Sequence, residues 1–120
     1  LPSLVSVGVD GATATSRKDI YFLRNTMLYT FSQAHYSVAE LNHWFAGLTA
    51  DDAVVLWQDG VYLPLHHPTL LPLSGIKLFA LEPDVRARGL SERYAGLAIE
   101  VIDYPALVSV SETYFPQIAL

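Results

Sequence analysis

The chain of 120 residues contains no cysteine, so histidines and carboxylates are its main candidates for acid–base or metal chemistry. Without a thiol, the chain cannot form a disulfide, a thiolate metal site, or a persulfide or thioester intermediate. His66 and His67 are adjacent, so their side chains point in divergent directions, and no third ligand has a suitable spacing. We interpret this pair as part of a solvated loop and predict neither a metal site nor a bound cofactor.

Two further residues, His43 and Asp59, could act as a base or an acid. No serine or cysteine nucleophile accompanies His43 in a recognisable motif, so we interpret it as a helix-surface or interface histidine. Asp59 belongs to the turn Gln58-Asp59-Gly60, which directly follows the apolar run Ala53–Trp57. Its carboxylate could anchor a ligand, act as an acid, or bond its own backbone, as is common in Asp-Gly turns. We favour the bond to its own backbone, and an interface or partner-site role of Gln58, Asp59 and Gly60 stays open as the alternative. We predict that the chain is not an enzyme.

Three arginines, Arg86, Arg88 and Arg93, could bind a phosphate, but the sequence has no glycine-rich loop to cradle one. We therefore predict that they form surface or inter-subunit ion pairs. The net charge is −5, and residues 27–120 carry 4 basic and 10 acidic side chains. Such an acidic balance repels a phosphate backbone, so direct binding of nucleic acid is not expected.

Apolar runs alternate with helical patterns from Met27 onward, which predicts β-α-β units and a mostly parallel sheet. The predicted strands are Leu28–Phe31, Ala53–Trp57, Ile76–Leu81 and Leu97–Ile102. The run Ala53–Trp57 is apolar without alternation, as in a strand covered on both faces, so we predict that it lies at the sheet centre. The turn after it then lies at the carboxyl end of a central strand, where open α/β sheets place their sites.

The first predicted helix begins after Ser37, its N-cap residue. Glu40 follows three residues later and completes a capping box, which satisfies two exposed backbone N–H groups. The apolar residues of this helix recur at spacings of three and four and are predicted to face the sheet: Val38, Leu41, Phe45 and Leu48.

The later elements are predicted from prolines and a glycine. Residues 62–69 are predicted to form a loop. Pro83 favours the first turn of a short helix that ends at Gly89, and Pro105 favours the start of a last helix that ends near Glu112.

The composition favours a folded protein that buries part of its surface against partners, because hydrophobic residues make up 52% and charged residues only 16%. Tyr62, Tyr94 and Tyr114 lie in segments predicted to be loops, and aromatic residues of this kind favour interfaces. No apolar run approaches the ~20 residues of a membrane-spanning helix. The N-terminus lacks the pattern of a secretory signal, so we expect a cytoplasmic location.

A compositional break falls near Met27, the only methionine. Residues 1–26 are rich in small and polar residues, whereas residues 27–120 show the pattern of one compact domain. We predict that residues 1–26 are an upstream extension or a remnant of cloning. In the alternative interpretation, Leu1–Val9 forms an additional strand.

Four segments together resemble the DsrH/TusB family. They are Met27-Leu28-Tyr29-Thr30, Gln58-Asp59-Gly60-Val61, Asp84-Val85-Arg86-Ala87-Arg88-Gly89-Leu90 and Ile102-Asp103-Tyr104. Each is weak alone, but their order and spacing match that family, and the resemblance covers residues 27–120. It implies a small three-layer α/β domain, with a mostly parallel sheet of about four to five strands and flanking helices.

The resemblance also implies partners and a pathway. Members join TusC/DsrF-like and TusD/DsrE-like subunits in a heterohexamer, which passes persulfide sulfur toward 2-thiouridine at the tRNA wobble position. A related complex serves dissimilatory sulfur oxidation. Some relatives carry a cysteine on the first helix, where this chain has Asn42-His43-Trp44-Phe45. We therefore expect a structural subunit whose partner carries the transferring cysteine.

Two other functions stay open on the sequence. A flavodoxin-like module for a small ligand would use the loops after Trp57 and Leu81, and ligand-induced thermal stabilisation would reveal it. An independent enzyme would show turnover with the purified chain alone.

Overall fold

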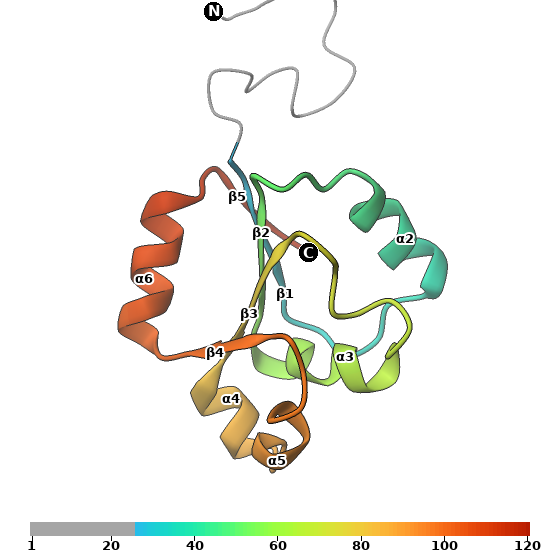
Figure 1. Cartoon of the computed structure of the whole chain (residues 1–120), viewed down its shortest axis with the longest axis vertical. Helices are drawn as coiled ribbons and strands as arrows, with labels where there is room; N and C mark the ends of the chain where they lie inside the picture. Colours follow the sequence, from blue (N-terminus) through green and yellow to red (C-terminus); the bar gives the residue numbers. More distant parts are fainter. Residues whose placement is uncertain (1–25) are drawn as a thin grey trace, which may run out of the picture.

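The computed structural model describes residues 26–120, and a parallel sheet of five strands forms its centre (Figure 1). The strands are β1 (Leu28–Phe31), β2 (Ala53–Leu56), β3 (Lys77–Leu81), β4 (Glu100–Ile102) and β5 (Gln117–Ala119). Their order across the sheet is β4-β3-β2-β1-β5, and every neighbouring pair is parallel. The predicted central position of β2 is confirmed, and all of its residues are buried. The predictions for residues 1–26 fall almost wholly outside the described residues.

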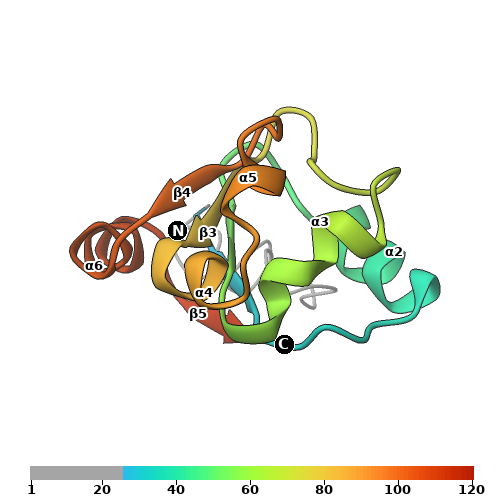
Figure 2. The same cartoon turned by 90° about the horizontal axis from the view of Figure 1, so that it is seen from below.

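Helices cover both faces of the sheet and give the predicted three layers. They are α2 (Val38–Ala46), the 3-10 helix η1 (Gln58–Tyr62), α3 (Leu63–His66), α4 (Glu82–Ala87), α5 (Ser91–Tyr94) and α6 (Tyr104–Thr113). Helix α6 lies on one side of the sheet, and α2 and α3 lie on the other side in both views (Figures 1 and 2). Among the described residues, no helix is long and apolar enough to cross a membrane.

The two faces of the sheet have separate buried clusters because successive side chains of a strand point in opposite directions. Tyr29 and Phe31 of β1 pack in the larger cluster with Leu41 of α2. Leu28 of β1 and Val55 of β2 belong to the smaller cluster, on the side of α6. The core therefore has one buried cluster on each face of the sheet, and α6 is the helix that covers the smaller cluster.

The capping box of α2 is confirmed. The Ser37 hydroxyl accepts a hydrogen bond from the Glu40 backbone N–H at 3.0 Å, and the Glu40 carboxylate accepts one from the Ser37 N–H at 2.8 Å. Leu41 is fully buried, but the prediction that Val38 faces the sheet is wrong, since it is 53% exposed. Val38 is the first residue of α2, and the buried residue of this helix is Leu41, one turn later.

Two other predictions need correction, and one helix was not predicted. Residues 62–69 are not one loop, because η1 ends at Tyr62 and α3 follows, with Pro64 in its first turn, a position that suits proline. The short helix α5 was not predicted. Its Tyr94 is buried, so the expectation of an interface role for this tyrosine is wrong.

The sheet has one strand beyond the segments predicted as strands. β5 pairs with β1, and two backbone hydrogen bonds flank this pair: Leu28 N–H to Pro116 O at 3.1 Å and Leu120 N–H to Thr30 O at 2.8 Å. The helices predicted from Pro83 and Pro105 are confirmed as α4 and α6. Gly89, the predicted end of the first of these, has a φ of 67°.

Candidate functional site

The turn Gln58-Asp59-Gly60 lies at the carboxyl end of the central strand β2, as predicted, and forms most of η1. The Trp57 N–H donates a hydrogen bond to the Phe31 carbonyl at 3.1 Å, which continues the pairing of β2 with β1. The Gly60 N–H then donates to the Trp57 carbonyl at 2.9 Å. Between them, Gln58 has a φ of 51°, an uncommon backbone conformation for a residue with a side chain. The chain therefore reverses tightly at the edge where α/β sheets place their sites.

Gly60 is required by the close approach of this turn to β1. A Cβ atom at Gly60 would lie 2.0 Å from the Phe31 carbonyl oxygen and 2.7 Å from the Phe31 carbonyl carbon. Both neighbours are backbone atoms, so they cannot move aside as a flexible side chain would. The glycine thus lets η1 pack directly on the end of β1.

Helix α4 holds the turn through two side chains. The Asp84 carboxylate accepts a hydrogen bond from the Gln58 N–H at 2.7 Å. The Arg88 guanidinium contacts Asp59 Oδ1 through Nε at 3.0 Å and Nη2 at 2.9 Å. Its Nη1 lies 3.5 Å from Asp84 Oδ1 and 3.3 Å from the Asp84 carbonyl oxygen. We call Gln58, Asp59, Asp84 and Arg88 the Arg88 cluster.

The Arg88 cluster is partly shielded from solvent. Exposed fractions of the side chains are 23% for Arg88, 18% for Asp84 and 60% for Asp59. One guanidinium therefore contacts two carboxylates, which leaves a net charge of −1 at this edge. This arrangement fixes the position of the turn, and the exposed Asp59 can offer its carboxylate to an approaching group.

A third contact reaches the turn from α5. The Tyr94 hydroxyl donates a hydrogen bond to the Val61 carbonyl at 2.6 Å, in the interior of the domain. Burial raises the pKa of Tyr94 above its ordinary value, because the ionised phenolate would be desolvated. The hydroxyl therefore keeps its proton and its bond to the residue after Gly60.

The other predicted candidates lie apart from the Arg88 cluster. His66 approaches the Ala34 carbonyl through Nδ1 at 3.3 Å, and its ring stacks on His35 and Tyr62. His43 lies exposed on α2, edge-on to Trp44. Within residues 26–120, no group of three His, Cys, Asp or Glu side chains could hold a metal ion.

Among the described residues, two of the three arginines form the predicted ion pairs. Arg86 pairs with Glu82 at 3.6 Å on the exposed face of α4, while Arg88 pairs with Asp59 and Asp84. The link between Asp59 and Arg88 was not predicted. The only signal for it in the sequence was that both residues belong to segments of the family resemblance.

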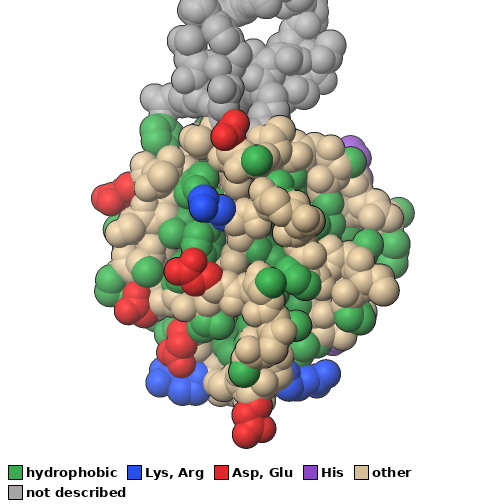
Figure 3. Space-filling view, viewed as in Figure 1, with side chains coloured by type: hydrophobic (Ala, Val, Ile, Leu, Met, Phe, Trp, Pro, Cys, Tyr) green, Lys and Arg blue, Asp and Glu red, His purple; other side chains and the backbone are tan. Residues whose placement is uncertain are grey.

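Exposed apolar side chains lie on and around α6, on the side of the sheet opposite α2 and α3. Val101, Tyr104, Val108 and Phe115 are all exposed, although each is large and hydrophobic. In the space-filling view, apolar side chains lie between acidic ones on this side, while both basic and acidic side chains lie at the end formed by α4 and α5 (Figure 3). This surface has the composition expected of a protein interface.

A family model described as "DsrH like protein" matches residues 33–117. The chain belongs to the DsrH family. The match contains all four residues of the Arg88 cluster of this DsrH-family chain. The resemblance inferred from the four sequence segments, to a family of sulfur-relay subunits, is confirmed.

Individual relatives of this DsrH-family chain align over nearly their full length. An uncharacterized protein of Haemophilus influenzae is 40% identical over 95 residues, which are 78% of this chain and 100% of that protein. Protein TusB of Pectobacterium carotovorum is 36% identical over 96 residues. Protein TusB of Yersinia enterocolitica is 33% identical over 96 residues, and both TusB alignments cover 78% of this chain and 99% of the relative.

Proposed function

We propose that this chain is a non-catalytic structural subunit of a heterohexameric sulfur-relay complex in the cytoplasm. The complex would also contain TusC/DsrF-like and TusD/DsrE-like subunits, and would pass persulfide sulfur for 2-thiouridine synthesis at the tRNA wobble position. Membership of the DsrH family, with relatives named TusB, is the observation that carries this proposal.

The absence of cysteine from the sequence defines the role of this subunit within such a relay. A thiolate accepts sulfur from one persulfide and passes it to the next, so a chain without cysteine cannot carry the sulfur. The transferring cysteine is therefore on a partner, and this subunit contributes to the position of that cysteine.

The apolar residues around α6 support assembly with other subunits. Tyr104 and Val108 are exposed on α6, and Val101 and Phe115 are exposed at its two ends. Burial of such side chains against a partner stabilises a complex by about 25 cal/mol for each Å² of apolar surface removed from water. The chain alone should therefore self-associate or be poorly soluble, and co-expression with its two partners should recover a defined complex.

Labelled sulfur tests the proposed role. The assembled complex is loaded from a persulfide donor, and each subunit is then analysed by mass spectrometry. We expect the label on a partner cysteine and none on this chain, together with loss of 2-thiouridine from tRNA when the gene is deleted. Covalent label on this chain, or transfer at full rate in a complex that lacks it, would contradict the proposal.

Asp59→Ala tests whether the Arg88 cluster serves the partner's site. If Asp59 only fixes the turn, the variant should be modestly less stable and transfer sulfur at the parental rate. If Asp59 lines the partner's site, transfer should fall while the complex remains assembled. Asp51→Ala is the matched control, because Asp51 is also an exposed aspartate in a turn but lies next to the amino end of β2.

A further inference from the structure

The outer edge of β5 directs backbone groups away from the sheet. β5 and β4 end the sheet on its two sides, so each of them pairs with a single neighbour. Alternate residues of a strand turn their N–H and C=O groups toward opposite sides. The two bonds that flank the β1–β5 pair use Pro116 and Leu120, so Ile118, midway between them, also faces β1. The N–H and C=O groups of Gln117 and Ala119 therefore face outward.

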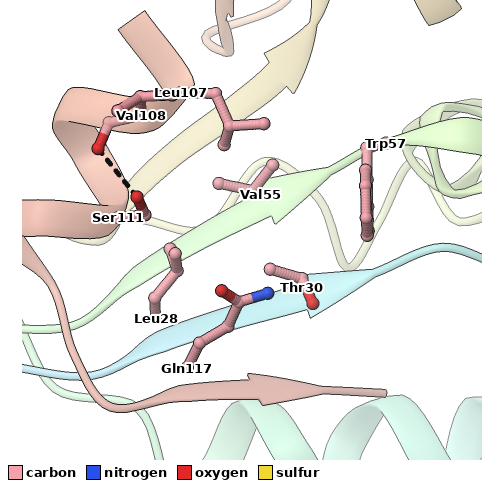
Figure 4. Close-up of a pocket in the computed structure, with 8 residues that line it drawn as sticks. All are labelled: Leu28, Thr30, Val55, Trp57, Leu107, Val108, Ser111 and Gln117. Atoms are coloured by element: carbon pink, nitrogen blue, oxygen red, sulfur yellow. Dashed lines mark hydrogen bonds between the residues drawn. The ribbon is translucent and has the colours of Figure 1, made fainter. Parts of the chain in front are cut away.

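This outer edge is open. Gln117 and Ala119 are both exposed, and no backbone hydrogen bond within the described part of the chain reaches their outward groups. Figure 4 shows the Gln117 side chain pointing over β1, toward Thr30, so this side chain does not cover the edge. An exposed strand edge of this kind is a template for pairing with a further strand.

The two edges of the sheet differ in charge. β4 contains the exposed Glu100, and the exposed Asp103 follows the strand directly. Charged side chains at an edge oppose its pairing with another chain. In contrast, residues 113–120, which include β5, contain no Asp, Glu, Lys or Arg, and neither do residues 26–39, which include β1. The β5 edge is thus the neutral edge of an acidic domain.

Charge and symmetry both favour a second copy of the chain as the occupant of this edge. Residues 27–120 carry 4 basic and 10 acidic side chains, so two copies repel each other least where their contact surfaces lack carboxylates. A two-fold axis at Ile118 places Gln117 of each copy opposite Ala119 of the other in an antiparallel pair. Opposite residues then exchange both of their N–H···O bonds, and every outward group of the two strands is satisfied.

We propose that two copies of this chain associate through their β5 edges as antiparallel strands, which joins the two five-stranded sheets into one. The contact has three residues on each side, so the dimer exchanges reversibly with the monomer. This inference goes beyond the structural role in a sulfur relay and does not rest on it. The two are compatible, because a heterohexamer of three kinds of subunit contains two copies of each.

Sedimentation equilibrium of the full chain over a range of concentrations measures the association, and we expect a monomer–dimer equilibrium. Ala119→Pro removes one outward N–H from each copy, and with it half of the hydrogen bonds of the contact, but leaves the bonds to β1 in place. The dissociation constant should rise about tenfold to a hundredfold. Ala119→Val is the matched control, because it keeps the N–H, and its dissociation constant should stay within about threefold of the parent's.

A single cysteine tests the register of the pair, because the chain itself contains none. Ile118 lies opposite Ile118 of the second copy, at a Cα separation of about 4.5 Å, which a disulfide can bridge. Under mild oxidation, Ile118→Cys should form a disulfide-linked dimer at least about tenfold faster than Ser109→Cys, which places the thiol at an exposed position of α6. This comparison holds even if Ala119→Pro fails to fold.

Val108→Ser separates this contact from the apolar surface on α6, because Val108 is exposed there. Its dissociation constant should stay within about threefold of the parent's. A parent chain that stays monomeric, equal dissociation constants for Ala119→Pro and Ala119→Val, or equal cross-linking of the two cysteine variants would overturn the proposal. So would a monomeric parent chain whose Ala119→Pro variant no longer binds the TusC/DsrF-like subunit, because the edge would then take a strand of that partner.

Discussion

Replacement of Gly60 by alanine is the most direct test of the turn at the candidate site. The new Cβ atom would lie 2.0 Å from the Phe31 carbonyl oxygen, so either η1 or the end of β1 must move by more than an ångström. Insertion of a methyl group into a packed region costs about 1–3 kcal/mol. The same oxygen accepts the Trp57 N–H at 3.1 Å, and weakening of that bond adds about 1 kcal/mol.

The free energy of unfolding of Gly60→Ala should therefore be about 2–4 kcal/mol lower than that of the parent chain, as measured by urea denaturation. For a domain of this size, the melting temperature should fall by roughly 10–30 °C. Gly96→Ala is the control, because a Cβ atom there meets nothing within 4 Å. That variant should unfold within about 1 kcal/mol of the parent. A Gly60→Ala variant as stable as Gly96→Ala would refute the close approach of η1 to β1.

Three further perturbations test the domain around the site. Asp52→Asn should lower the free energy of unfolding by about 1.5–3 kcal/mol, because the buried Asp52 carboxylate accepts the N–H groups of Met27 and Thr49; urea denaturation measures the change. Above about pH 10, Tyr94 loses its proton in the unfolded chain but keeps it in the folded one, so the free energy of unfolding of the parent falls as the pH rises. Tyr94→Phe should reduce this fall, and denaturation at a series of pH values measures the free energy of unfolding of both chains. A chain of residues 27–120 should keep the melting temperature and partner binding of the full chain, since β1 begins at Leu28; early melting or insolubility would make residues 1–26 an integral part of the fold.

Local sequence patterns predicted the central layer of the fold well. The unbroken apolar run of β2 requires cover on both faces, and only a central strand receives it. The Ser37–Glu40 capping box depends on neighbours in sequence, so its geometry follows without knowledge of the rest of the chain. In contrast, β5 and α5 span only three and four residues, too few for a periodic signal. β5 is a strand because its backbone pairs with the edge of β1, which is far from it in the sequence, and local patterns do not report such a pairing.

The candidate site was predicted in position but not in its contacts. The end of a buried strand identifies where a parallel sheet opens, and this placed Gln58, Asp59 and Gly60 correctly at its carboxyl edge. The partner of Asp59, however, is Arg88, which lies 29 residues further along the chain. Nothing in the local sequence distinguishes Arg88 from Arg86 and Arg93, because the choice depends on which face of α4 meets η1.

The geometry of Asp59 explains how a subunit without a nucleophile could still act on a partner's site. Both contacts of Arg88 with this carboxylate use Oδ1, at 2.9 Å and 3.0 Å, and within residues 26–120 no hydrogen bond or ion pair reaches Oδ2. Arg88 is in turn held by Asp84, so the Asp59 side chain is positioned before any partner arrives. A group that is already ordered loses less conformational entropy on binding than a free one. A fixed acceptor at an exposed sheet edge is therefore suited to the positional role proposed for this subunit.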